Sequence, residues 1–267
     1  MGLQAAHGLL ACPVCAEALD VGASTATCPA GHSFDVARQG HLNLLGAAPP
    51  ANADSVAMVE ARERVLASGA FDAVDAALAR RAGGARTILD VGGGTGHHLA
   101  RLLDALPEAR GVSLDVSLPA ARRAARAHDR AASVVADAWG TLPIRPRRIG
   151  LVTCVFAPRN MAEFARVLAD GGLLLVVTPD PEHLAALRAR HDLLAIEAGK
   201  DDRLARAASG HFSLVARHRV SVPLAADAGL ARDLIAMGPN AFHGVPEAVD
   251  PVDTEVAVSL WLFRPLR

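Results

Sequence analysis

Three of the four cysteines lie within the first thirty residues, close to a histidine. Cys12 and Cys15 are separated by two residues, Cys28 follows after twelve more, and His32 after a further three. The pattern C-x2-C-x12-C-x3-H supplies three thiolates and one imidazole, which is a complete tetrahedral ligand set for zinc. Because no coordination position is left open, the spacing predicts a structural Zn²⁺ ion rather than a catalytic one.

The segment around this pattern, residues 1–45, is rich in glycine, proline and turn-forming residues and shows no helical period. A module of this size buries too little apolar surface to fold alone, so the metal would contribute much of its stability. The alternatives are unligated cysteines, or a C-x-x-C redox pair, which would leave Cys28 and His32 unexplained.

A glycine-rich loop follows a predicted strand at 87–91 and opens a predicted helix at 96–106. It reads Asp90-Val-Gly-Gly-Gly-Thr-Gly96, and its glycines allow a sharp turn and a close approach of the backbone to a ligand. By itself such a loop is compatible with NAD, FAD or S-adenosylmethionine.

Three acidic residues near successive predicted strand ends favour S-adenosylmethionine. Asp90 precedes the first glycine by two positions and can meet the amino group of the methionine portion, which a dinucleotide lacks. Asp115 ends the second strand and can accept hydrogen bonds from ribose hydroxyls. Asp137, followed by Ala138, comes after the third strand, where methyltransferases contact the adenine amino group.

The elements that must position these residues alternate between strand and helix. After a proline-containing linker at 46–53 and two helices, apolar strands and helices follow one another up to about residue 178, which predicts a doubly wound, mostly parallel sheet. The last of these elements are a helix at 160–168 closed by Asp170-Gly171-Gly172, a strand at 173–178, and a helix that begins at Pro181. Two longer strands, at 211–222 and 254–263, predict a terminal antiparallel hairpin. We therefore expect a zinc-binding module (1–45), a linker and helical connector (46–84), and a Rossmann-like class I methyltransferase domain (85–267).

Composition and hydropathy bear on whether the protein binds nucleic acid, contacts a membrane or is secreted. The net charge is −1 and the pI about 6.8, so there is no overall basic surplus for nucleic acid. No apolar run approaches the roughly 18 residues of a membrane span, and no secretory signal is evident, which predicts a cytoplasmic protein without membrane contact. Arginine clusters at 122–130 and 145–148 are either solvated surface or contacts to RNA phosphates.

Taken in order, the motifs resemble the 23S ribosomal RNA guanine-N1 methyltransferases of the RlmA/TlrB type, a family that includes tylosin-resistance enzymes. The resemblance covers nearly the whole chain, through residues 12–15, 28–45, 54–62, 90–101, 155–160, 178–184 and 237–243. It implies zinc at the Cys3His set, and cofactor contacts at Phe71, Gly94, Thr95 and His183. With the loop reasoning above, the predicted cofactor site consists of Phe71, Asp90, Gly92, Gly94, Thr95, Gly96, Asp115, Asp137, Ala138 and His183.

The resemblance also implies the substrate, a guanine in a hairpin loop of 23S rRNA. We expect the base beside the loop 156–160, contacted by Phe156, Pro158 and Arg159, with Phe242 or Trp139 available for stacking. Arg159 would steady the guanine O6 or bind phosphate. No general base is assigned; Arg159, Asn160 and His243 are catalytic candidates, and His97, His98 and His183 are further candidates by residue type.

Other functions stay open at this point. The linker 46–53 lacks the basic residues that relatives carry there, which favours a small-molecule methyltransferase of secondary metabolism that retains the zinc module. A non-catalytic binding protein and a nicotinamide dehydrogenase are less compatible with the three acids. Macrolide resistance and a homodimer are compatible with the resemblance.

Overall fold

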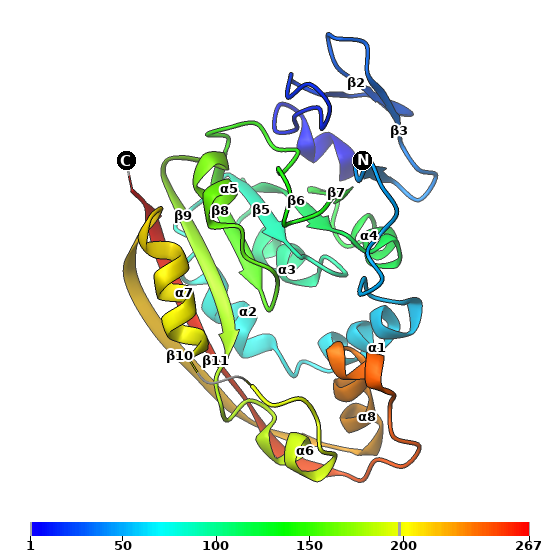
Figure 1. The fold of residues 1–267 in the computed structure, drawn as a ribbon, viewed down its shortest axis with the longest axis vertical. Helices are drawn as coiled ribbons and strands as arrows, with labels where there is room; N and C mark the ends of the chain where they lie inside the picture. Colours follow the sequence, from blue (N-terminus) through cyan, green and yellow to red (C-terminus); the bar gives the residue numbers. More distant parts are fainter. Residues whose placement is uncertain (1, 197–198, 267) are drawn as a thin grey trace.

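An eight-stranded sheet forms the centre of the computed structural model, which describes residues 2–196 and 199–266 (Figure 1). The strand order is β10-β11-β9-β8-β5-β6-β7-β4. The strands from β4 to β9 pair in parallel, whereas β11 is antiparallel to both β9 and β10. Their bounds are β4 (His41–Asn43), β5 (Thr87–Val91), β6 (Arg110–Asp115), β7 (Ala131–Val135), β8 (Ile149–Val155), β9 (Leu168–Pro179), β10 (Phe212–Ala226) and β11 (Val252–Pro265).

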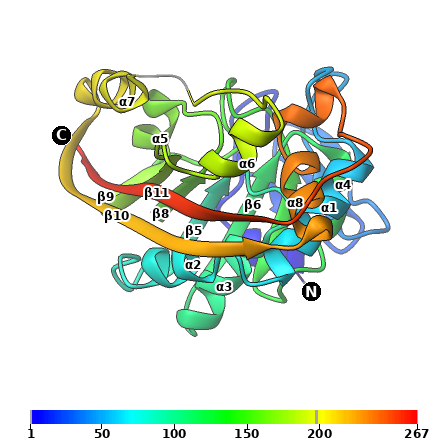
Figure 2. The ribbon, with the colours of Figure 1, turned by 90° about the horizontal axis from the view of Figure 1, so that it is seen from below.

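Helices cover both faces of this sheet, as the view from below shows (Figure 2). On one face lie α2 (Asp72–Ala79) and α3 (His97–Ala105), and on the other α5 (Met161–Val167). The remaining helices are η1 (Gly2–Ala6), α1 (Val56–Ala67), α4 (Leu118–Ala124), α6 (Ala185–Arg190), α7 (Lys200–Ser209), α8 (Ala228–Ala236) and η2 (Pro239–His243). The inner strands β5 and β7 are mostly apolar and almost wholly buried because both of their faces are covered.

The zinc-binding segment forms its own three-stranded sheet and also contributes to the large one. β1 (Asp20–Val21), β2 (Thr25–Thr27) and β3 (Ser33–Asp35) pair antiparallel, whereas β4 joins β7 at the far edge of the large sheet. A bridge between Leu10 and Ile144 adds a second contact. The segment is therefore fixed to the methyltransferase domain by backbone pairing.

The strand order creates a crevice where β5 meets its two neighbours. β6 and β7 extend from one side of β5, and β8 and β9 from the other. In open α/β sheets, ligands bind outside the carboxyl ends of strands at such a reversal of order. The predicted cofactor acids Asp90, Asp115 and Asp137 all lie at or just beyond this edge.

Some elements differ from the sequence-based expectation. The helix expected from Pro181 begins at Ala185, because residues 181–184 form a turn that ends with Leu184 in the left-handed region (φ 53°). The strand expected at 173–178 starts at Leu168 and includes the two glycines that we interpreted as a helix end. None of the helices in the described ranges is long and apolar enough to cross a membrane.

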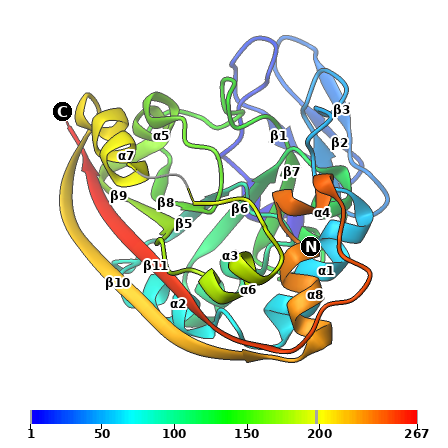
Figure 3. The ribbon, with the colours of Figure 1, turned by 60° about the horizontal axis from the view of Figure 1, so that its bottom comes forward.

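The predicted terminal hairpin is present and closes one side of the sheet. β10 and β11 pair along almost their whole length and curve around the domain (Figures 2 and 3). β10 is the outer strand, and its residues alternate between half-buried and exposed.

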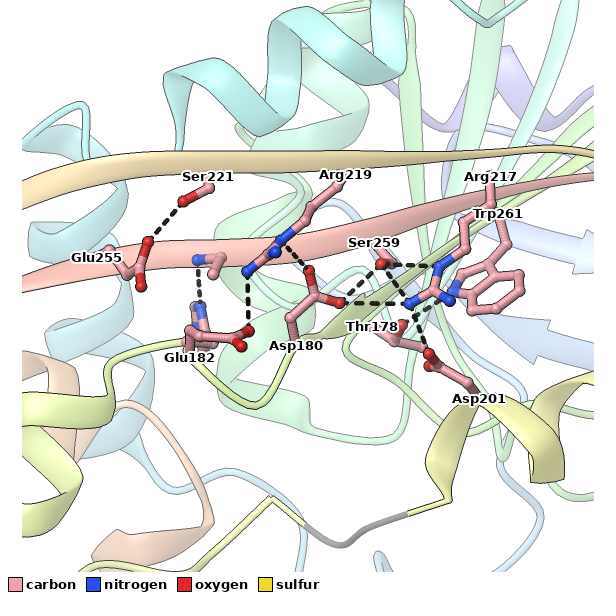
Figure 4. A network of polar contacts seen from close by, with 12 residues as sticks. Thr178, Asp180, Glu182, Asp201, Arg217, Arg219, Ser221, Glu255, Ser259 and Trp261 are labelled. Carbon is pink, nitrogen blue, oxygen red and sulfur yellow. Dashed lines mark hydrogen bonds and ion pairs between the residues drawn. The ribbon is translucent and has the colours of Figure 1, made fainter.

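A buried carboxylate ties this hairpin to β9 (Figure 4). Asp180, 4% exposed, accepts a hydrogen bond from Ser259 Oγ at 2.7 Å on β11. It also pairs with Arg219 Nε at 3.2 Å and lies 3.8 Å from Arg217 Nη2, both on β10. Arg217 in turn stacks over Trp261 at 4.3 Å. One acid thus joins three strands.

We predict that Asp180→Ala lowers the free energy of unfolding by about 2 kcal/mol, because it leaves Ser259 and two arginines without their shared acceptor. The matched control is Glu182→Ala, which removes an exposed partner of Arg219 (2.9 Å) and should cost about 0.5 kcal/mol or less. Urea denaturation followed by circular dichroism measures both. Equal effects of the two substitutions would contradict a special role for the buried acid.

Candidate active site and metal centre

The four predicted zinc ligands converge on one point at the end of the small sheet. His32 Nδ1 lies 3.6 Å from Cys12 Sγ and 3.3 Å from Cys28 Sγ, and Cys15 Sγ lies 3.6 Å from Cys28 Sγ. Zinc bonds of about 2.3 Å to sulfur and 2.0–2.1 Å to nitrogen imply tetrahedral edges of about 3.5–3.8 Å. The donor set and its spacing therefore fit a structural Zn²⁺ ion.

Local backbone bonds explain why the sequence places these ligands together. The amide of Ala16 donates to Cys12 O at 2.9 Å, and the amide of Gly31 to Cys28 O at 3.0 Å, so each ligand pair lies on a tight turn. Gly31 has φ 87°, a backbone conformation that residues other than glycine rarely adopt.

The glycine loop turns sharply at the end of β5. Gly92, Gly94 and Gly96 all have positive φ, at 68°, 54° and 78°. A Cβ on Gly92 would lie 2.3 Å from the Cβ of Ala157, so the loop packs directly against the segment after β8. Thr95 is buried at the turn into α3 and borders a groove of about 470 Å³ between α1, α3 and α4.

Asp90 presents a buried oxygen with no partner. Its Oδ1 accepts a hydrogen bond from Thr153 Oγ1 at 2.7 Å, whereas Oδ2 has no hydrogen-bond partner among the described residues. Complete burial raises the pKa of Asp90 to about 6, although the charge of His98 opposes this shift. A buried acceptor without a donor is costly, and the ammonium group of the methionine portion of S-adenosylmethionine would supply one. This observation fits the predicted cofactor.

Asp115 holds the glycine loop in place. Its Oδ2 accepts from the Gly94 amide and its Oδ1 from the Ser117 amide, both at 2.8 Å. Burial raises the pKa of this carboxyl group. Just beyond the end of β7, Asp137 Oδ1 accepts from the Trp139 amide at 2.9 Å. The structure therefore brings both acids to the same edge of the sheet, as the sequence predicted, and shows that each also shapes its own loop.

Three predicted site residues form an aromatic cluster beyond β8. The ring of Phe156 lies 5.9 Å from that of Phe71 and 5.7 Å from that of His183, the latter stacked. Phe156 is a non-glycine residue with φ 54° and is 43% exposed, a strained conformation of the kind found at functional sites. The structure thus brings two predicted cofactor contacts together with a predicted substrate contact.

His183 is neutral at physiological pH. Its Nδ1 accepts a hydrogen bond from the Ala257 amide at 3.3 Å. Burial, together with the charge of Arg188, lowers its pKa to about 4. A group with so low a pKa is a weak general base at pH 7, so the position suits contact with a cofactor better than proton transfer.

The side chain of Asn160 holds two loops together. Its Oδ1 accepts from the Glu163 amide at 3.3 Å and caps α5, while Nδ2 donates to the carbonyls of Trp139 and Gly140 at 3.2 and 3.1 Å. The neighbouring thiol of Cys154, whose pKa burial raises to about 12, lies 3.4 Å from Ala157 O. These contacts fix the loop 156–160, which also contains Pro158 and the half-buried Arg159.

The remaining predicted substrate contacts are exposed. Trp139 is 68% and Phe242 49% exposed. Phe242 and His243 lie in η2, directly after α8, which packs beside α1 (Figure 3). Exposed rings of this kind are available to stack on an incoming base.

Sequence reasoning missed Asp75, a buried residue of α2 that holds both histidines of the first turn of α3. Its Oδ2 lies 2.9 Å from His97 Nε2 and its Oδ1 2.6 Å from His98 Nδ1. Burial opposes ionisation, but the hydrogen bonds from the two histidines leave the pKa of Asp75 well below its usual range. Both carboxylate oxygens of Asp75 thereby have a partner in the first turn of α3, where the positive end of the helix dipole lies. The signal in the sequence that could have identified Asp75 is its position among the apolar residues on the buried face of α2.

Comparisons with known proteins agree with this geometry. The family model described as "RlmA, N-terminal", a zinc ribbon, matches residues 10–49, and a methyltransferase-domain model matches residues 88–172. A Streptomyces fradiae 23S rRNA (guanine(748)-N(1))-methyltransferase is 46% identical over 89% of this chain and 87% of its own length. A Micromonospora griseorubida protein named for 23S rRNA guanine-N1 methylation is 43% identical over 96% of this chain and 97% of its own.

Among solved structures, a chain from a complex of the Haloferax volcanii Trm112 methyltransferase activator with a methyltransferase has a TM-score of 0.52. It is 16% identical and covers 78% of this chain and 94% of its own length. This likeness concerns the fold. The cofactor S-adenosylmethionine and the structural zinc follow from the two matched domains and the donor sets described above.

We predict that Cys28→Ser removes the zinc, because a hydroxyl group replaces one of the four ligands, and that it lowers the thermal unfolding midpoint. The zinc content measured by elemental analysis should fall from one equivalent per chain toward none. Cys154→Ala is the matched control, since it removes the cysteine outside the set and should retain the metal. Loss of zinc from both variants alike would contradict the assignment.

We predict that affinity for S-adenosylhomocysteine falls about tenfold per pH unit below pH 6. The ammonium group of the ligand binds the ionised form of Asp90, and because the pKa of Asp90 is raised to about 6, protonation of this carboxylate competes with ligand binding in that range. By the same linkage, the ligand-free protein loses stability as the pH rises from about 4 to 6. Calorimetry between pH 5 and 7.5 measures the affinity. Asp90→Asn should bind more weakly at pH 7 with no such slope; an unchanged slope would assign the titration to another group.

Proposed function

Because this chain belongs to the family of 23S rRNA (guanine-N1)-methyltransferases, we propose that it transfers the methyl group of S-adenosylmethionine to N1 of a guanine in 23S rRNA. The observation that carries the proposal is the extent of the similarity. Identity of 43–46% spans both the zinc ribbon and the methyltransferase domain. The small-molecule alternative is not favoured, because the relatives that share both modules are named for rRNA methylation.

The target guanine is proposed to lie in a hairpin loop, where bases are unstacked and can enter a protein site. Trp139 and Phe242 offer exposed rings for stacking, and the exposed Arg122 of α4 is available for a phosphate. An RNA substrate of this kind places the activity in the cytoplasm.

The chain's own residues would act mainly by positioning. S-adenosylmethionine supplies an electrophilic methyl group, and N1 must approach it in line. The strained Phe156 and the loop 156–160, held by Asn160, would border the base. Arg159, in the same loop, would stabilise the negative charge that builds on O6 as N1 loses its proton to a water molecule.

Primer extension on 23S rRNA tests the proposed function, because an N1-methyl group blocks base pairing and stops reverse transcriptase. RNA from a host lacking such an enzyme should acquire a new stop beside one guanine when the gene is expressed. The guanine equivalent to position 748, named for the Streptomyces relative, is the first to examine. Absence of any new stop with folded, zinc-loaded protein would refute the proposal.

We predict that Arg159→Ala lowers kcat by about 100-fold with a small change in KM, since an oxyanion-stabilising donor acts in the transition state. Arg86→Ala, at an exposed position just before β5 and so at the opposite end of that strand from the loop, is the control and should retain activity. Methylation kinetics on a hairpin RNA measure both. A raised KM with unchanged kcat would show instead that Arg159 binds phosphate.

A further inference from the structure

The methionine portion of S-adenosylmethionine carries a carboxylate as well as an ammonium group. Asp90 would bind only the ammonium group. A carboxylate taken out of water needs charged or N–H donors of its own, so a complete site for this zwitterion should include a cation near the glycine loop.

Arg62, on α1, places its guanidinium against that loop. Its Nη1 lies 3.2 Å from the position that a Cβ on Gly94 would occupy. The side chain is 24% exposed, and its charge acts on the buried Asp115. Arg64, on the same helix, instead makes two hydrogen bonds to Asp233 on α8, at 2.6 and 2.7 Å.

Two neighbours hold the Arg62 guanidinium in place. Nη1 donates to Asp54 Oδ2, and Nη2 donates to the carbonyl of Met237 at 2.7 Å. The carbonyl of Asp54 is itself held by Ser117 Oγ at 2.8 Å. These contacts use two of the five N–H groups of the guanidinium, so the cation is oriented at the loop and retains donors for a ligand.

We propose that Arg62 binds the carboxylate of the cofactor's methionine portion, whereas Asp90 binds the ammonium group of the same portion. The inference rests on the S-adenosylmethionine site of the proposed function and adds a binding residue to it. A planar guanidinium with free N–H groups suits a carboxylate. Asp90 and Arg62 together would recognise both charges of the amino-acid end.

A ligand pair isolates the carboxylate. Calorimetry compares S-adenosylhomocysteine with its decarboxylated analogue, which keeps the ammonium group, the thioether and the nucleoside. The wild-type protein should bind the analogue about 10- to 100-fold more weakly, the range for a hydrogen-bonded charged pair. Arg62→Gln should bind both ligands with similar affinity, and Arg62→Lys should retain part of the preference for the carboxylate.

Arg64→Gln is the matched control, because it also removes a contact from α1 to α8 but lies off the loop; it should keep the wild-type preference. Circular dichroism and zinc content verify that each variant is folded. If Arg62→Gln keeps the full preference, or weakens both ligands equally, Arg62 only links α1 to the end of α8 and the inference is wrong.

The outcomes also separate this inference from the proposed function. Failure of the wild-type protein to bind S-adenosylhomocysteine would overturn the inference together with the cofactor site beneath it. A normal Arg62-dependent preference without rRNA methylation would support the inference while refuting the RNA substrate.

Discussion

Asp90 carries a buried carboxyl group at the end of β5, and one of its oxygens has no donor in the part of the chain that the structure describes. A folded protein tolerates such a group only when its surroundings fix it firmly or a ligand completes it. Here Thr153 on β8 satisfies the first oxygen, and the glycine loop passes close to the second, since a Cβ on Gly93 would lie 2.8 Å from it. The strand order places β8 and β6 on either side of β5, and at this point a cationic cofactor would supply the donor that Asp90 lacks among the described residues.

Polar contacts join the segments around this crevice. Asp115 accepts from the glycine loop, Asn160 links the loops after β7 and β8, and Arg62 links α1 to the end of α8. The loop held by Asn160 also contains the predicted substrate residues Phe156, Pro158 and Arg159, and Met237 lies shortly before Phe242. The predicted cofactor residues and the predicted substrate residues therefore lie on connected segments.

The zinc ribbon is part of this arrangement through its backbone. β4 extends the large sheet beside β7, and Leu10 pairs with Ile144 in the segment that follows Trp139. Loss of the metal would disturb a sheet edge and a loop near the exposed Trp139, so a structural ion can influence the surface to which RNA is proposed to bind.

The zinc ligands, the glycine loop, the three acids and the alternation of strands and helices were predictable from the sequence, because each depends on residues a few positions apart or on a short repeating pattern. Helix bounds near Pro181 and the strand from Leu168 were not, since turn geometry and pairing with neighbouring strands override local preference. The partnership of Asp75 with His97, 22 residues away, and that of Arg62 with Met237, 175 residues away, required the tertiary structure. Contacts between residues so far apart in the sequence produce no recognisable spacing pattern. Only folding brings their atoms within hydrogen-bond distance.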